Sequence, residues 1–586
     1  MITYAQLSVL LLSLAGPASA ALNCLPEGSV VPKPSLLRSS ILKSAGTNLT
    51  RTLDDAIKGT IKAGWAVENT SFSLAVVSLD QKDPGVPIWE YHHRAEKNTN
   101  GTKKVTRDSQ YLIGSVSKLI SDYILLQSGV DLDRAVTDFL PELNSTRSKV
   151  QWRDVTLRML GSQLSGGPTN GGFSEYYFLK DLFVKYGFPP LQDADYPSCG
   201  VMGLNKGCSP GQVLDDMVNQ YPVTAPMERP AYSNIAFTIF VMALERVTGK
   251  NYTQMVDEVL SKPLGMESTF PSPGDDKKAV IPPGESSWGA DYGDNAPGGG
   301  LVSTISDLSK FSHAMLGRSL DLNRTQIRQW LKPIAWTGAY SAVGLPWEIF
   351  RPLHLTPNHP HPVAIYAKSG GAALYSSQLS IIDEYGLGLI MLSAGNQGAS
   401  NVLSDALLAT FVPAADEEAR AQAEKNYART FKSPCAGQQQ QQQQNRTLEA
   451  TFKLDNDSLI VSAISDSGND VLSGLRSLWG LTMGQYTAGL GPTIRLFPTD
   501  LSEMVAVNGE SLAKEVWRLW PEFEDGLESD LPGSKLGYDN CQQWTLGDWV
   551  HYGKEPLDRV LFYRDGGGRV VGFEMPSLRS GLLRPV

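Results

Sequence analysis

The sequence predicts an α/β fold in which a β-sheet region is interrupted by a helical insertion, followed by a separate β domain. Three observations predict it. Apolar, strand-like runs stand on both sides of a long stretch with helical periodicity. A glutamine run then divides the 586-residue chain, and the pattern after it consists of short strands.

The sheet region is indicated by five short runs. Residues 72–79 are mostly apolar, and residues 87–91 follow a Pro/Gly turn. Further strands are expected over residues 364–367, 377–381 and 387–392.

Helices are predicted between and after these runs. One begins at Gly114-Ser115, where Val116, Leu119, Ile120, Tyr123 and Ile124 form an apolar face. Residues 150–260 carry several helical stretches, notably 235–247, and a polar helix is expected over 401–427. Strands, helices, strands and a helix in this order favour a sheet with a helical insertion.

The polar tract from Pro434 to Asn445 contains seven consecutive glutamines and cannot form a core, so residues 431–445 are predicted to be a linker. Residues 446–586 are predicted to be a β-rich domain. Its strand candidates are 459–463, 494–497 and 515–520, with a hairpin over 560–573 around Gly566-Gly567-Gly568.

The first 20 residues have the pattern of a signal peptide. An apolar core over residues 7–15 precedes Ala18-Ser19-Ala20, which has the form of a cleavage site. The mature protein is therefore expected to be secreted and extracellular, with its first domain over residues 21–430. A formal charge of −10 without any basic block argues against a nucleic acid or a membrane surface as partner.

Sequons and cysteines fit an oxidising compartment. Eight glycosylation sequons occur, at Asn48, Asn69, Asn100, Asn144, Asn251, Asn323, Asn445 and Asn456. Of the five cysteines, Cys199 and Cys208 share a short Gly- and Pro-containing loop and are the preferred disulfide. The sequence leaves open which of Cys24, Cys435 and Cys541 pair.

The sharpest chemical feature is Ser115-Val116-Ser117-Lys118. On a helix, positions i and i+3 share a face, so the Lys118 amine is expected beside the Ser115 hydroxyl. A serine hydroxyl needs a neighbouring base to become a nucleophile, and burial with nearby cations can keep an amine basic. The start of the helix would favour a developing oxyanion there.

This spacing also occurs at Ser40/Lys43 and Ser511/Lys514, where it is interpreted as coincidence. Ser115 differs because Tyr232-Ser233-Asn234 and then Lys368-Ser369-Gly370-Gly371 follow it in the chain.

With these three motifs the chain resembles class C serine beta-lactamases and the related D-Ala-D-Ala carboxypeptidases and esterases. The resemblance covers about residues 50–412 and extends to 129–143, 155–166 and 298–308. Secreted beta-lactamase-like proteins of filamentous fungi share the layout. The resemblance implies a serine beta-lactamase-like fold with a largely antiparallel sheet and the active site between sheet and helices.

The resemblance also implies residue roles. Ser115 would become acylated, while Lys118 and Tyr232 would share proton handling, with Tyr232 favoured as general base. Asn234 would hold Lys118 or a substrate amide, and Lys368 would anchor a substrate carboxylate or stabilise the phenolate. The N–H groups of Ser115 and Gly371 would form the oxyanion hole. Ser369 and Gly370 would line the substrate site.

Two departures leave the substrate open. The family's His-Thr is Gln163-Leu164 here. The segment between Gly166 and Tyr232 is aromatic, and either core packing or the wall of an apolar acyl pocket explains it, with packing favoured. The aromatic residues are Tyr176, Tyr177, Phe178, Phe183, Tyr186 and Phe188.

The function expected from the sequence is a serine hydrolase acting on an ester or amide bond of a small-molecule or peptide substrate. An acyltransferase of secondary metabolism with the same residues, and a catalytically silent binding protein, are the alternatives. No cofactor or metal is predicted, and the histidines at 354, 359 and 361 are interpreted as a solvated loop.

Overall fold

The computed structural model describes residues 25–434, 447–484, 489–523, 530, 532, 543–545 and 547–586. The predicted signal peptide, Cys24, Cys435, Cys541 and the Asn445 sequon lie outside these residues. The chain divides into two compact units, one of residues 32–422 and the other of residues 1–31 with 423–586.

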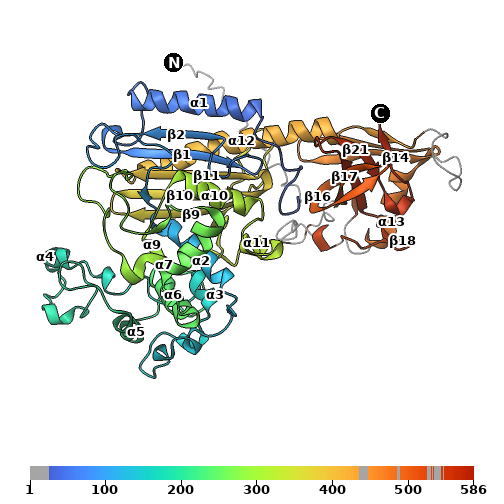
Figure 1. Ribbon diagram of the computed structural model, residues 1–586. Coiled ribbons are helices and arrows are strands. Elements are labelled where there is room, and N and C mark those ends of the chain that lie inside the picture. Colours follow the sequence, from blue (N-terminus) through green and yellow to red (C-terminus); the bar gives the residue numbers. More distant parts are fainter. Residues whose placement is uncertain are drawn as a thin grey trace, which may run out of the picture. The chain divides into compact units, whose positions relative to one another are not determined.

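The first unit contains an antiparallel sheet. Within residues 32–422, all of which are described, eight strands pair in the order β2-β1-β11-β10-β9-β8-β7-β6, and Figure 1 shows β2, β1, β11, β10 and β9 stacked in that order. Every pairing along it is antiparallel, which confirms the predicted architecture. The strands are β1 (Ser71–Ser78), β2 (Trp89–His93), β6 (Ala335–Trp336), β7 (Ser341–Val343), β8 (Glu348–Phe350), β9 (Ile365–Ala372), β10 (Tyr375–Ile382) and β11 (Leu387–Ala394).

Both faces of this sheet are covered, which explains why every residue of β1 is buried. Ala75 and Val77 join the core that contains Phe311 of α10 (Ile305–Leu316). Val76 is paired with Trp89, on the opposite side. The Trp89 ring packs on α1 (Ser40–Ile57), where its Nε1 donates to Gly46 O, and on α12 (Ala399–Tyr427).

The helical insertion has a strongly apolar centre. Residues 235–244 of α6 (Ile235–Thr248) are all buried, as is most of α2 (Ser117–Gln127). A small sheet in the order β3-β5-β4 connects the insertion to the segment that precedes Ser115. The remaining elements are β3 (Tyr111–Leu112), β4 (Phe270–Pro271), β5 (Leu301–Ser303), α3 (Leu157–Gly161), α4 (Lys180–Lys185), α5 (Pro210–Asn219), α7 (Tyr252–Val256), α8 (Lys262–Leu264), α9 (Ala296–Gly299) and α11 (Arg324–Trp330).

The second unit is a near-barrel β domain. Among its described residues, nine strands form one sheet in the order β21-β20-β17-β16-β14-β13-β12-β22, with β15 on β14. Four phenylalanines, Phe431, Phe452, Phe562 and Phe573, fill its centre with ring centroids 4.9–5.9 Å apart. Its elements are β12 (Thr430–Lys432), β13 (Leu448–Leu454), β14 (Leu459–Asp466), β15 (Asn469–Asp470), α13 (Val471–Thr482), β16 (Leu490–Val507), β17 (Glu510–Phe523), β18 (His551–Tyr552), β19 (Glu555–Pro556), β20 (Arg559–Arg564), β21 (Val570–Glu574) and β22 (Arg584–Pro585).

The structure corrects three expectations. The strand expected over residues 364–367 extends to Ala372 in β9 and so contains the Lys368-Ser-Gly-Gly motif. Helices α1 and α13 were not predicted from their sequences. The histidine loop is not wholly solvated, because His361 is buried and its Nε2 lies 3.1 Å from the Tyr385 hydroxyl.

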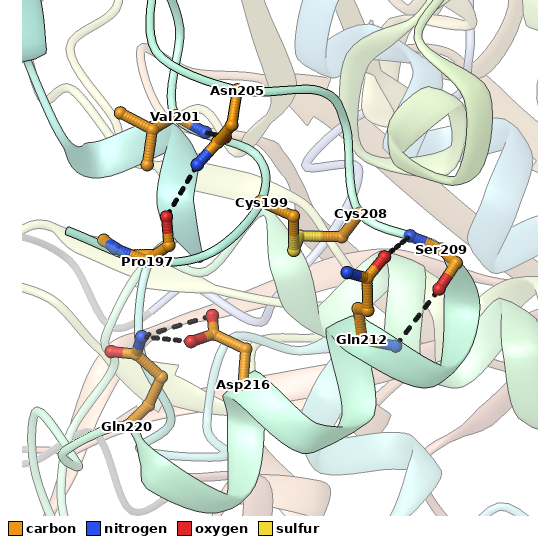
Figure 2. Close-up of a disulfide and its surroundings, with 9 residues drawn as sticks. All are labelled: Pro197, Cys199, Val201, Asn205, Cys208, Ser209, Gln212, Asp216 and Gln220. Carbon is orange, nitrogen blue, oxygen red and sulfur yellow. Dashed lines mark hydrogen bonds between the residues drawn. A yellow bond between two sulfur atoms is a disulfide. The ribbon is translucent and has the colours of Figure 1, made fainter. Parts of the chain in front are cut away.

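The Cys199–Cys208 disulfide is present and closes a loop before α5 (Figure 2). Asn205 organises that loop, since its Oδ1 accepts from Val201 N and its Nδ2 donates to Pro197 O. Ser209 then caps α5 in a reciprocal pair with Gln212.

Removing this disulfide should lower the free energy of unfolding by about 2–3 kcal/mol, because the bond restricts the unfolded chain by closing this short loop. The loop should also open more often in the folded protein. In a Cys199→Ala/Cys208→Ala variant, we expect trypsin to cleave the native protein after Lys206 much faster than in the wild type. Cleavage after Lys185, which is exposed on α4 outside the loop, is the internal reference. Equal cleavage rates at Lys206 in both proteins would contradict the prediction.

Candidate functional site

Ser115, the candidate nucleophile, lies on a turn that is held by hydrogen bonds. Ser115 lies in a single 3₁₀ turn, Gly114–Val116, between β3 and α2. The buried Ser117 hydroxyl donates to Gly114 O at 2.6 Å and accepts from Leu301 N at 3.1 Å. These bonds join the turn to β5 and fix Ser115 at the start of the helix, where it stays partly exposed.

Strand β9 passes directly beside this turn, and only glycine fits there. A Cβ on Gly370 would lie 2.1 Å from Ile113 O and 2.4 Å from the Ser377 hydroxyl. One on Gly114, whose φ is +48°, would lie 2.5 Å from Gly371 N. The backbones that carry the two predicted oxyanion donors, Ser115 and Gly371, are therefore neighbours.

Lys118 is fully buried beside the Ser115 hydroxyl. Its Nζ lies 2.9 Å from Ser115 Oγ, donates to Asn234 Oδ1 at 2.7 Å, and also contacts Gly298 O. Burial, and then the nearby charge of Lys368, hold the pKa of Lys118 well below its ordinary range. The amine is therefore neutral more readily than an exposed lysine.

Tyr232 lies on the other side of the same hydroxyl. Its OH donates to Ser115 Oγ at 2.7 Å, while 41% of the residue is exposed. The Nζ atoms of Lys118 and Lys368 lie 5.0 and 5.4 Å from the centre of its ring. The two amines, the phenol and the serine hydroxyl named from the sequence are thus brought together.

The segment that carries Tyr232 and Asn234 is held by Gln163, whose role the sequence did not reveal. Gln163 Oε1 accepts from Ser233 N at 2.5 Å, and its backbone carbonyl accepts from Ala231 N. Asn234 Nδ2 donates to Asn170 Oδ1 at 2.9 Å, so its Oδ1 is oriented toward Lys118. The departure from His-Thr thus places a supporting amide behind the motif.

Lys368 has a partner that sequence analysis also missed, Glu348. Its Nζ donates to one oxygen of the Glu348 carboxylate, and the other oxygen accepts from Ser369 N at 2.9 Å and Ser369 Oγ at 2.8 Å. Burial opposes ionisation of Glu348, but Lys368 and Ser369 hold its pKa below the ordinary value. Strand pairing brings the two residues together, because Glu348 on β8 lies opposite Ala367 on β9.

A second unexpected carboxyl lies one helical turn after Lys118. Asp122 is fully buried, and neither oxygen has a hydrogen-bond partner among the described residues. Burial raises the pKa of Asp122 well above its ordinary value, although the Lys118 charge opposes this. The carboxyl is therefore protonated over a wider pH range than an exposed aspartate.

The other Ser-x-x-Lys pairs have different surroundings. Ser40 and Lys43 are exposed on α1. Ser511 lies on β17, where Lys514 forms an ion pair with Glu503. Ser40 also begins a helix, but its pair is exposed, whereas Lys118 is buried.

The aromatic segment after Gly166 is not core packing, contrary to the favoured expectation. Most of its large side chains are exposed by two-fifths or more: Phe173, Tyr176, Phe178, Phe183, Tyr186 and Phe188. In Figure 1, α4 lies at the far end of the insertion from α2.

The described residues contain no group of three or more His, Cys, Asp or Glu side chains arranged to hold a metal ion. No described helix is long and apolar enough to cross a bilayer. Of the described sequons, all but the half-buried Asn69 have an exposed asparagine.

Two family models match the sequence. The one described as Beta-lactamase matches residues 57–413. The one described as Beta-lactamase-like-like, C-terminal domain, matches residues 419–586.

Similar proteins cover most of the chain. A beta-lactamase-like protein of Arthroderma benhamiae is 44% identical over 580 residues, which is 96% of each chain. The probable hydrolase clz13 of Cochliobolus lunatus is 26% identical over 100% of this chain and 95% of its own. A beta-lactamase/D-alanine carboxypeptidase structure from Yersinia pestis has a TM-score of 0.46 at 19% identity, covering 62% of this chain and 99% of that chain.

Gly370 and Gly371 of the Lys368-Ser-Gly-Gly motif should differ sharply in how well they tolerate substitution by alanine. Gly370→Ala would force a methyl group onto Ile113 O and Ser377 Oγ, so we expect this variant to unfold at a lower denaturant concentration than the wild type. Gly371→Ala is the matched control, because its Cβ would meet no atom within 4 Å. Chemical denaturation followed by fluorescence compares them, and equal stability of the two variants would contradict this geometry.

Lys118 should give stability a specific pH dependence. Because the pKa of Lys118 is lowered in the folded protein, unfolding takes up a proton at any pH between that value and the ordinary one near 10.5. The free energy of unfolding should therefore rise with pH in this window, by up to about 1.4 kcal/mol per pH unit. Relative to Lys118→Met, the wild type should gain stability from pH 7 to pH 10 in urea titrations. A constant difference would show that the buried amine is charged.

Proposed function

The chain belongs to the beta-lactamase family, and we propose that it is a secreted serine hydrolase. It would cleave ester or amide bonds through an acyl-enzyme on Ser115. The observation that carries the proposal is the double contact on one hydroxyl. Lys118 Nζ and Tyr232 OH lie 2.9 and 2.7 Å from Ser115 Oγ. A serine so placed has a base on one side and a proton donor on the other.

The hydrogen-bond geometry favours Lys118 as the first base. A neutral amine has two N–H groups and one lone pair. Asn234 Oδ1 and Gly298 O accept only, so they take the two N–H groups and leave the lone pair for the Ser115 proton. This differs from the sequence-based preference for Tyr232 in that role.

Tyr232 then serves the leaving group. Its hydroxyl already donates to Ser115 Oγ, and its partly exposed position faces the side from which a substrate arrives. As the bond to the leaving group breaks, the phenol supplies a proton and recovers one from Lys118 through the site. Two flanking ammonium groups stabilise the transient phenolate.

The oxyanion that forms during attack would be held by the N–H groups of Ser115 and Gly371. Donors of this kind are each worth about 3–4 kcal/mol in other hydrolases. The empty space where a Gly371 Cβ would stand supports an approach of the acyl carbonyl from that side. Water then completes hydrolysis by the reverse proton route.

Secretion is proposed from the sequence and is supported by compatible features. The Cys199–Cys208 disulfide forms readily only in an oxidising compartment. Six sequon asparagines are exposed and thus accessible to glycosylation, Asn48, Asn100, Asn144, Asn251, Asn323 and Asn456.

The mechanism predicts which serine reacts. A fluorophosphonate probe should label the purified protein at Ser115, and Ser115→Ala should abolish both labelling and turnover of aryl esters. Lys118→Met and Tyr232→Phe should lower kcat/KM by about 10²–10⁴-fold, as expected for loss of a general acid or base. Mapping the label by mass spectrometry identifies the site.

Ser40→Ala and Ser511→Ala are the matched controls. Each removes the serine of another Ser-x-x-Lys motif, and both serines lie outside the site. They should react at the wild-type rate. Labelling that persists in Ser115→Ala, or wild-type kcat/KM in Lys118→Met, would overturn the proposal.

A further inference from the structure

The Lys368-Ser369 subsite already contains a carboxylate, and it comes from the chain itself. An ammonium, a hydroxyl and a backbone N–H converge at this place, which is a donor set suited to a substrate carboxylate. All three donate to Glu348: Lys368 Nζ to one oxygen, Ser369 N and Ser369 Oγ to the other.

The cation beneath this carboxylate is inaccessible. The Lys368 side chain is 1% exposed, and its Nζ also donates to Ser369 O at 2.9 Å. The Glu348 side chain, by contrast, is 37% exposed. An anion arriving from solvent therefore meets the negative group of this ion pair first, not the positive one.

We propose that Glu348 is a specificity-determining residue that fills the carboxylate subsite from within, so that the site selects esters or amides with no carboxylate beside the scissile bond. This inference rests on the proposed hydrolase function and names its substrate class. A substrate carboxylate would have to displace Glu348 from three donors or lie against it, and like charges in a partly desolvated site repel strongly.

The arrangement also assigns Lys368 a different task. Its charge is balanced by Glu348, and it lies 5.4 Å from the centre of the Tyr232 ring. Lys368 therefore acts on the phenol beside Ser115, and the substrate is held by other contacts. In the reaction, Ser115 Oγ forms an ester with the acyl carbon and its proton passes to Lys118. The bond to the leaving oxygen or nitrogen breaks, that atom takes a proton from Tyr232, and Lys118 returns a proton to the phenolate.

Two substrates with the same acyl group test this directly. Benzoylglycyl-D-lactate carries a carboxylate beside the scissile ester, and its lactate methyl ester does not. Both would give the same benzoylglycyl-enzyme, so deacylation is identical and only the step that meets Glu348 differs. Release of benzoylglycine, measured by chromatography, gives kcat/KM for each.

We expect the wild type to prefer the methyl ester by about tenfold or more, the effect of one unfavourable charge pair in a partly buried site. In Glu348→Gln the ratio of the two kcat/KM values should shift toward the carboxylate substrate by a similar factor. The ratio cancels a general loss of activity, and the wild-type preference tests the inference even when Glu348→Gln does not fold. Glu258→Gln is the matched control, because Glu258 forms an exposed ion pair with Lys250 elsewhere in the same unit.

A wild-type preference for the free acid, equal use of both substrates, or an unchanged ratio in Glu348→Gln would overturn the inference. Fluorophosphonate labelling of Ser115 separates this from failure of the proposed function, since labelling would persist. Hydrolysis of neither substrate would also overturn the inference, and absence of labelling would then remove the hydrolase proposal with it.

Discussion

The burial of one amine governs the chemistry of this protein. Lys118 is completely enclosed by the sheet and the helical insertion, and its three polar contacts come from the Ser115 turn, the start of α6 and α9. Taking a charge out of water is costly, so the packing that surrounds Lys118 favours its neutral form. The apolar helices α2 and α6 thus provide the low-polarity surroundings that the site requires.

The site also requires the backbone of β9 to lie close to the Ser115 turn. This explains the glycines in the Lys368-Ser369-Gly370-Gly371 motif. Strand β9 can lie against the Ser115 turn only because Gly370 has no side chain there. The Ser377 hydroxyl on β10 then donates to Ile113 O at 2.6 Å and fixes the neighbouring backbone. The sheet therefore positions Ser115 as much as the helix does.

Much of this arrangement was predictable because local patterns encode it. Apolar runs placed β1, β9, β10 and β11, and the order of three motifs identified Ser115, Lys118, Tyr232 and Lys368. Glu348 and Gln163 were not predictable, because their contacts depend on strand pairing and on a loop conformation that no spacing rule reports. The aromatic segment misled the prediction because aromatic composition alone does not reveal whether a side chain has a partner.

Tyr232 and Lys118 touch the same hydroxyl but differ in their access to water. Lys118 is sealed, whereas two-fifths of Tyr232 faces solvent. A proton on the sealed amine can leave only through Ser115 or the phenol, while the phenol exchanges with bulk solvent directly. Protons that the proposed reaction gains or loses overall therefore pass between Lys118 and solvent through Ser115 and Tyr232, the two partly exposed groups in contact at its amine.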